Sequence, residues 1–303
     1  MNVYLPIAEI SVNVFALVGM GALVGMFSGL FGVGGGFLMT PLLIFFGIPP
    51  AVAVATQANQ IVAISVSGAL AQWRRGNVDV VMGLMLVAGG FVGSTAGVWL
   101  FSYLREIGQI DLVISLSFVV FLGVIGVLML IESVRTYMKR RRHLPPQKRR
   151  HYWVHALPLK MKFRKSGIYV SALLPIAIGA FIGLLVAIMG IGGGFIMVPA
   201  MIYLLGMPTI MVVGTSLFQI IFVTANVTLL QAATNATVDI LLALVLMLGG
   251  IVGAQFGVRF GNRLNAESLR FLLSALVLGV CGKLVYDLIA TPADLYTVVP
   301  AGF

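Results

Sequence analysis

The chain has 303 residues, of which 60% are hydrophobic and only 9% are charged. A soluble domain carries about 25% charged residues, so this composition excludes a soluble globular protein, a disordered chain and a nucleic-acid-binding domain. It favours a protein that uses the lipid bilayer as its solvent. The formal net charge of +10 is interpreted as the positive-inside signal of a membrane protein rather than as a nucleic-acid-binding surface.

Ten apolar segments follow one another along the chain. They are expected at 11–31, 36–48, 51–72, 80–103, 112–132, 168–190, 195–207, 210–232, 240–260 and 270–290. Most have about 20 residues, enough for a helix to cross the ~30 Å hydrocarbon core, but the second and seventh are too short to do so. The chain therefore divides into a first membrane repeat (1–132), a basic linker (133–167), a second membrane repeat (168–292) and a C-terminal tail (293–303).

The two halves match each other in sequence. Residues 32–41 have the sequence GVGGGFLMTP and residues 190–199 have GIGGGFIMVP. After one-residue insertions the register continues from Thr56 to Thr215 and then from Asp79 to Asp239. Shared apolar composition would not align these polar residues, so the register indicates a duplication. We expect an all-α polytopic membrane protein made of two repeats, each with about five hydrophobic segments.

The basic residues predict the orientation of the chain. Twelve of the 19 Lys and Arg residues lie between Arg135 and Lys165. Placing this linker in the cytoplasm also puts Arg74 and the arginines near residue 263 inside, provided that each half crosses the membrane an odd number of times. The repeats are then inverted relative to each other and both termini are periplasmic. Four crossings in each half, in a parallel arrangement, is the alternative.

Glycine clusters interrupt the apolar segments at 32–36 and at 190–194. A helix rarely continues through three consecutive glycines, since each costs ~1 kcal/mol relative to alanine. We therefore expect broken helices, as helical hairpins, over 11–48 and 168–207. Close packing of neighbouring helices is the alternative role for these glycines.

A short helix would follow each break. It would begin near Phe37 in the first half and near Phe195 in the second, with N–H groups that are free to bind an anion. Pro41 and Pro199 fall four residues further on, where they suit the first turn or a kink beyond it. We expect these two prolines to act as hinges.

Polar side chains recur on the third and eighth segments. Thr56 and Gln60 are four residues apart, as are Thr215 and Gln219, so each pair lies on one helical face. Such side chains within a span face a cavity or another helix, and both ligand contact and interhelical hydrogen bonding remain open for them. The candidate substrate-binding residues are Gly34, Gly35, Gly36, Phe37, Thr56, Gln57, Asn59, Gln60, Gly192, Gly193, Gly194, Phe195, Thr215, Ser216, Gln219, Asn226 and Lys283.

Charged residues are scarce within the spans. Asp79 and Asp239 each begin an apolar segment, which favours N-capping over proton coupling. Lys283 is the one basic residue well inside a span, where it would either reach the membrane surface or bind an anion. The spans contain no His, and the single cysteine, Cys281, excludes a Cys-based metal cluster. We expect no metal, no cofactor and no enzymatic activity.

These residues resemble the TauE/SafE family of sulfite exporters, also called TSUP or DUF81 permeases. The resemblance rests on the glycine motif with its Phe and Pro in both halves and on Thr56 and Thr215, and it covers roughly 12–132 and 168–290. It implies a bacterial inner-membrane permease for sulfite, sulfonates, sulfoacetate or related small organosulfur and carboxylate anions.

The resemblance agrees with what the residues predict. Two opposed helix N-termini and neutral Gln and Thr side chains would hold a small anion near the midplane and still let it depart. A proton or a sodium ion is a candidate coupling ion, and the lipid bilayer is the surrounding partner. A passive anion channel is one alternative. A membrane scaffold that binds partners through the basic linker is the other.

Overall fold

The computed structural model describes residues 2–31, 36–141, 160–163, 165–261 and 266–290, and almost all of this chain is helical. The first half contains α1 (Val14–Phe31), α2 (Gly36–Phe45), α3 (Pro50–Arg74), α4 (Val80–Glu106) and α5 (Ile110–Arg141). The second half contains α6 (Leu173–Met189), α7 (Gly194–Tyr203), α8 (Thr209–Leu230), which continues into a π-helical segment (Gln231–Asn235), α9 (Ile240–Gly261) and α10 (Ala266–Ile289). The predicted all-α membrane fold is confirmed.

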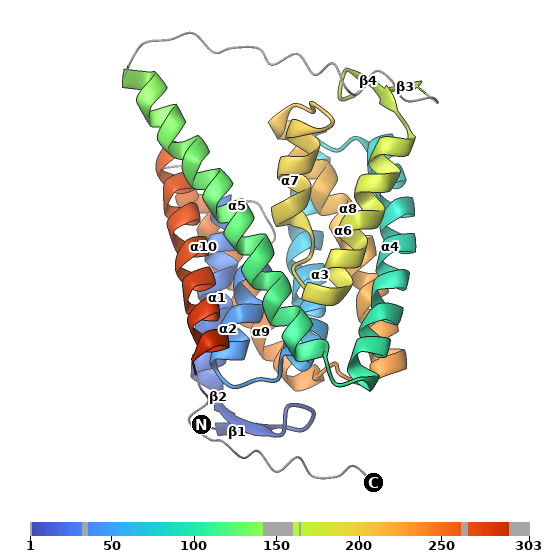
Figure 1. The fold of residues 1–303 in the computed structure, drawn as a ribbon. Coiled ribbons are helices and arrows are strands. Elements are labelled where there is room, and N and C mark those ends of the chain that lie inside the picture. Colours follow the sequence, from blue (N-terminus) through green and yellow to red (C-terminus); the bar gives the residue numbers. More distant parts are fainter. Residues whose placement is uncertain (1, 32–35, 142–159, 164, 262–265, 291–303) are drawn as a thin grey trace.

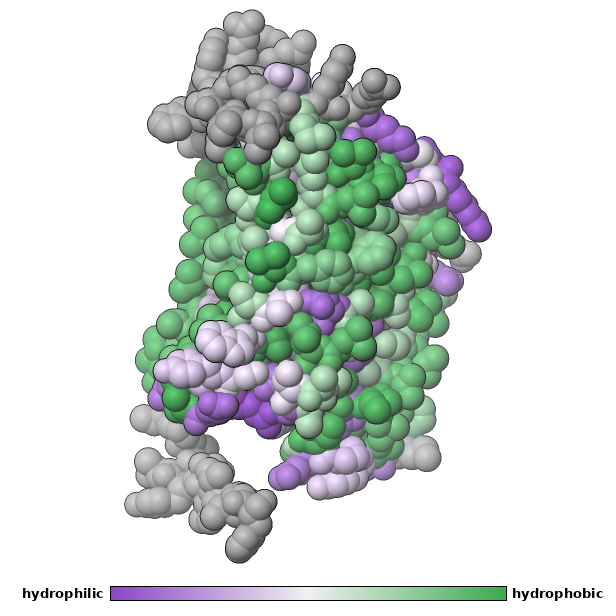
Figure 2. All heavy atoms as spheres, turned by 90° about the vertical axis from the view of Figure 1, so that its right-hand side faces the viewer, coloured by the Kyte–Doolittle hydropathy of each residue, from purple (hydrophilic) through white to green (hydrophobic). Residues whose placement is uncertain are grey.

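Six of the described helices are long and apolar enough to cross a membrane: α3, α4, α5, α8 with its π-helical continuation, α9 and α10. By contrast, α2 and α7 have ten residues each and reach about 15 Å, half of the hydrocarbon core. Apolar side chains cover most of the face in Figure 2, with hydrophilic residues mainly toward the two ends. This distribution is the one that a surrounding bilayer requires.

Two short hairpins that we did not expect from the sequence precede the first helix of each half. Strand β1 (Asn2–Leu5) pairs with β2 (Ile10–Asn13), and β3 (Lys160–Phe163) pairs with β4 (Ile168–Ser171). The second hairpin crosses the boundary expected between linker and second repeat at 167. Helix α5, with 32 residues, is about 48 Å long and carries the chain nine residues past the expected boundary at 132.

The two halves begin at opposite ends of the molecule. The hairpin β1–β2 lies at the lower end in Figure 1 and β3–β4 lies at the upper end. Helix α10 ends at the same end as β1–β2, whereas α5 ends at the opposite one. This placement is what an inverted duplication would produce, and which end faces the cytoplasm stays a prediction.

Each half packs its first helix against the fourth helix of the other half. Helix α1 lies along α9, α6 lies along α4, and α3 and α8 pack against each other. Glycines let the backbones approach: a methyl group on Gly93 would overlap the carbonyl oxygen of Ala180, and one on Gly253 would overlap that of Ala22. The glycines of α4 and α9 therefore serve the close packing expected for them.

We predict that Gly93→Ala destabilises the protein. The added methyl group would push α6 away from α4, and such overpacking costs about 1–3 kcal/mol. The matched control is Gly279→Ala in α10, where an added methyl group meets nothing within 4 Å. The temperature at which the detergent-purified protein aggregates should fall for Gly93→Ala and stay or rise for Gly279→Ala. Equal temperatures for both variants would contradict the packing role.

Candidate substrate-binding site

The second glycine cluster is a true break in the helix. Helix α6 ends at Met189, and Gly190 caps it with φ +66° and donates its N–H to the carbonyl of Val186 at 2.8 Å. Gly192 and Gly193 have φ of +71° and +76°, a left-handed region that favours glycine. Helix α7 begins directly afterwards at Gly194. The break predicted in the second half is thus confirmed.

The first break falls outside the described residues. Gly34 and Gly35 belong to the segment 32–35, so the structure describes only its flanks, where α1 ends at Phe31 and α2 begins at Gly36. These flanks match those of the second break. The two short helices therefore begin at glycines that are equivalent in the two repeats, Gly36 and Gly194.

The start of α2 meets the second break and the start of α7 inside the protein. A methyl group on Gly36 would lie 2.5 Å from the carbonyl oxygen of Ile191 and 2.6 Å from the side chain of Ile61. The rings of Phe37 and Phe195 stack with their centroids 4.5 Å apart and an interplanar angle of 15°. All five residues are buried. We call this contact the junction; it brings the first turns of α2 and α7 face to face.

The junction is electrically neutral but polarised. Its side chains are apolar or absent, while each helix start carries a partial positive charge from the aligned peptide dipoles of its helix. Such an end binds anions without a cationic side chain. Broken backbone at membrane depth is tolerated only where protein or a water-filled cavity surrounds it, and here the packed interior surrounds it.

Polar side chains of α2 and α3 connect the two helices in the first half of the junction. The amide nitrogen of Gln57 donates to the carbonyl of Gly36 at 2.7 Å, and the Thr40 hydroxyl donates to the Gln57 amide oxygen. Thr40 was not among the site residues predicted from the sequence. The counterpart of Gln57 in the second half, Ser216, donates to the carbonyl of Val213 in its own helix, at 3.1 Å, and has no other hydrogen bond to the described residues.

Gln60 and Gln219 occupy equivalent positions in the two repeats but have different surroundings. The Nε2 of Gln60 donates to the carbonyl of Leu246 on α9 at 3.0 Å. Gln219 is 1% exposed, and neither its Nε2 nor its Oε1 has a hydrogen-bond partner in the described part of the chain. Both polar groups of the Gln219 side chain, its NH₂ and its Oε1, are thus without a hydrogen-bond partner among the described residues.

Thr56 and Thr215 hold the repeats together. The hydroxyl of Thr56 accepts the backbone N–H of Asp239, and that of Thr215 accepts the backbone N–H of Asp79, both at 3.0 Å. Each hydroxyl of one half therefore binds the start of the fourth helix of the other half. This arrangement corresponds to the interhelical alternative for these two residues.

Asp79 and Asp239 cap α4 and α9 as predicted. Asp79 accepts the N–H of Met82 at 3.2 Å, and Asp239 accepts that of Leu242 at 3.0 Å. The second oxygen of each carboxylate binds a hairpin turn: Asp79 accepts from the backbone and hydroxyl of Ser166. Asp239 accepts from the backbone of Ile7. Each hairpin thereby locks onto a helix of the opposite half.

The remaining predicted residues lie elsewhere. Asn226 donates to Ser94 on α4 at 2.9 Å, and Asn59 is partly buried on α3. The structure does not bring Lys283 to the junction: its side chain is 54% exposed, pairs with Asp287 at 3.0 Å and lies over the ring of Phe45. Pro41 and Pro199 lie inside α2 and α7, and their role as hinges stays a prediction.

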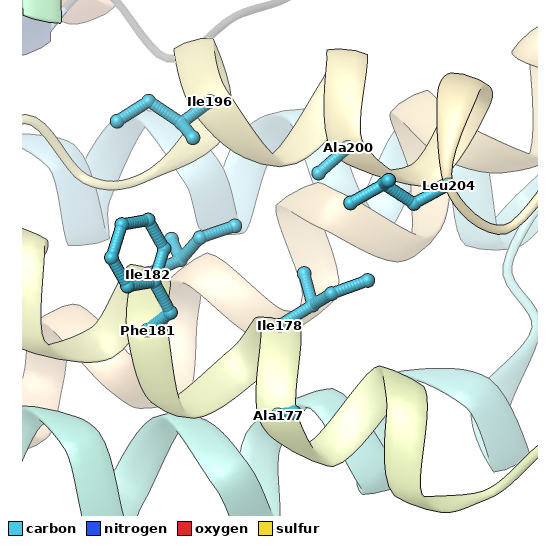
Figure 3. A pocket seen from close by; sticks show the side chains of 7 residues that line it. All are labelled: Ala177, Ile178, Phe181, Ile182, Ile196, Ala200 and Leu204. Carbon is cyan, nitrogen blue, oxygen red and sulfur yellow. The ribbon is translucent and has the colours of Figure 1, made fainter. Parts of the chain in front are cut away.

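A groove between α6 and α7 is apolar throughout. It has a volume of ≈ 340 Å³ and is lined by Ala177, Ile178, Phe181, Ile182, Ile196, Ala200 and Leu204 (Figure 3). The sticks in Figure 3 are all carbon, so the groove offers an anion no side-chain hydrogen bond. We do not assign the substrate to it.

Long apolar helices, and two short helices whose starts meet inside the protein, define a multi-pass membrane protein. The chain belongs to the sulfite exporter TauE/SafE family, whose family model matches residues 17–284. This is a family of membrane transporters and not of enzymes.

Curated relatives are similar over nearly their whole length. The probable membrane transporter protein YjnA of Bacillus subtilis (strain 168) is 29% identical over 262 residues, which cover 86% of this chain and 94% of the relative. A probable membrane transporter protein of Xylella fastidiosa (strain 9a5c) is 32% identical over 261 residues, covering 84% and 87%. No solved structure matches the chain.

We predict that Asp79→Ala and Asp239→Ala each lower stability by about 1–3 kcal/mol, because each removes a helix cap and leaves hairpin donors unpaired. The control is Asp287→Ala, which removes an exposed ion pair and should change stability by less than about 0.5 kcal/mol. Thermal unfolding of the detergent-purified proteins measures all three. A cap variant as stable as the control would refute the locking role of the hairpins.

Proposed function

We propose that this transporter carries sulfite, sulfonates, sulfoacetate or related small organosulfur and carboxylate anions across the bacterial inner membrane, and that the anion binds at the junction. The observation that carries this proposal is the meeting of the two helix starts, with Gly36 against Ile191 and Phe37 stacked on Phe195. Two converging helix N-termini concentrate partial positive charge where the protein excludes lipid.

Transport by alternating access fits the junction better than a permanently open channel. The junction residues Phe37, Ile61 and Phe195 are 1–3% exposed and fill the space between the helix starts. An anion therefore reaches the site only when α2 or α7 moves, and the prolines inside these helices are the proposed hinges. A proton or sodium gradient is the proposed energy source. The end of the molecule that carries the basic linker is proposed to face the cytoplasm.

Gly193→Ala is expected to abolish anion uptake while the protein still inserts into the membrane. The added methyl group would lie 2.7 Å from Ile182 on a residue with φ +76°, so that the first turn of α7 must shift. Uptake of sulfite and of sulfoacetate into proteoliposomes, with and without imposed proton and sodium gradients, measures the effect.

Two controls separate this effect from general damage. Gly206→Ala introduces the same left-handed strain, at φ +71°, in a position with nothing within 4 Å, and it should transport normally. Lys283→Met should also transport normally, because Lys283 pairs with Asp287 away from the junction. Normal uptake by Gly193→Ala would remove the junction from the mechanism. Uptake that ignores both gradients and runs at channel rates would instead favour a passive channel.

A further inference from the structure

Gln60 and Gln219 occupy equivalent positions in the two repeats. Each side-chain amide lies over a glycine of the neighbouring helix: a methyl group on Gly250 would lie 2.5 Å from Nε2 of Gln60, and one on Gly90 would lie 3.1 Å from Nε2 of Gln219. The glycines leave room for the amides. The same side chain is thus placed in the same way against α9 and against α4.

Within the described part of the chain, only the Gln60 amide has a hydrogen-bond partner. Gln60 donates to the carbonyl of Leu246, whereas Nε2 and Oε1 of Gln219 have no partner among the described residues. The carbonyl that corresponds to Leu246 is that of Leu86. Gly21 of α1 packs against the first and Gly179 of α6 against the second, so the backbone packing is equivalent and the difference lies in how the two amides are placed. An unpaired amide in a buried site is costly, so a ligand that pairs with it would gain stabilisation.

Helix α6 connects Gln219 to the second break. Its amide and Gly183 of α6 both contact Gly90. The residue before Gly183, Ile182, packs on Gly193 at the start of α7. The amide of Gln219 is therefore placed at the contact of α4, α6 and α8, and α6 connects it to the helix start that contributes to the proposed anion site.

We propose that Gln219 binds the transported anion and selects oxyanions that also carry a hydrogen-bond donor, such as hydrogensulfite or hydroxy- and amino-substituted sulfonates. This inference rests on the proposed function. The NH₂ group of Gln219 donates to an anionic oxygen. Its Oε1 accepts from an O–H or N–H of the same ligand. An oxyanion without a donor leaves Oε1 unpaired beside a negative charge and binds more weakly.

The test uses two sulfonates that differ by one hydroxyl group, 2-hydroxyethanesulfonate and ethanesulfonate. Titration calorimetry on the full-length, detergent-purified protein should show roughly tenfold tighter binding of 2-hydroxyethanesulfonate, equal to about 1.4 kcal/mol. Gln219→Met, which keeps the side-chain length, should bind both sulfonates equally and weakly. The matched control Gln60→Met should keep the preference, because Gln60 is bound to Leu246.

A second measurement excludes a purely structural role for Gln219. Without ligand, Gln219→Met should melt at the temperature of the wild type or above it, because it replaces an amide with no partner among the described residues by an apolar group. A clear drop in melting temperature would show that the amide is paired within the protein, and would overturn the inference. Gln219→Leu serves in the same way if the Met variant does not fold.

The outcomes also separate this inference from the proposed function. Equal binding of the two sulfonates by the wild type, or a preference that survives in Gln219→Met, would overturn the role of Gln219 and leave the anion transporter in place. If the wild type binds neither sulfonate and does not bind sulfite, the proposed function fails, and this inference fails with it.

Discussion

The structure depends on one constraint: a peptide group within a bilayer must find a hydrogen-bond partner inside the protein. Continuous helices satisfy it alone, but the broken backbone at Gly190–Gly193 does not. The break is tolerated because α2, α3 and α6 enclose it, with Ile61 packed on Gly192 and Gly36 packed on Ile191. The region that cannot face lipid is therefore also the region where the starts of α2 and α7 meet.

Each half of the chain supplies packing surfaces and hydrogen bonds that the other half needs. The first helix of one half packs along the fourth helix of the other through glycine contacts, and the threonines at 56 and 215 bind the opposite helix starts. The hairpins bind the capping carboxylates of Asp79 and Asp239. Neither half could bury its own glycine-rich face alone, so the junction at the centre requires that both halves be present and correctly placed.

Local chemistry explains which features could be predicted from the sequence. The break at residues 190–193 and the caps at Asp79 and Asp239 follow from glycine and carboxylate preferences that act within a few residues. The partners of Thr56 and Thr215 lie 183 and 136 residues away, so their role as interhelical contacts was only one of two open alternatives. The hairpins have four-residue strands, too short for a clear alternating pattern. Lys283 was placed by hydropathy alone, which cannot show that its side chain faces outward to Asp287.

The differences between the halves have two separate causes. Gln57 ties α2 to α3 through Gly36 and Thr40, but the repeat supplies Ser216 in the second half, and among the described residues Ser216 donates within α8. Gln60 and Gln219 are identical residues, and equivalent glycines, Gly21 and Gly179, pack on the carbonyls of Leu246 and Leu86, so the difference lies in how the two amides are placed. The Gln57 contact attaches the start of α2 to α3, and among the described residues Ser216 gives α7 no equivalent contact, so the mobile part of this junction is expected on the side of α7.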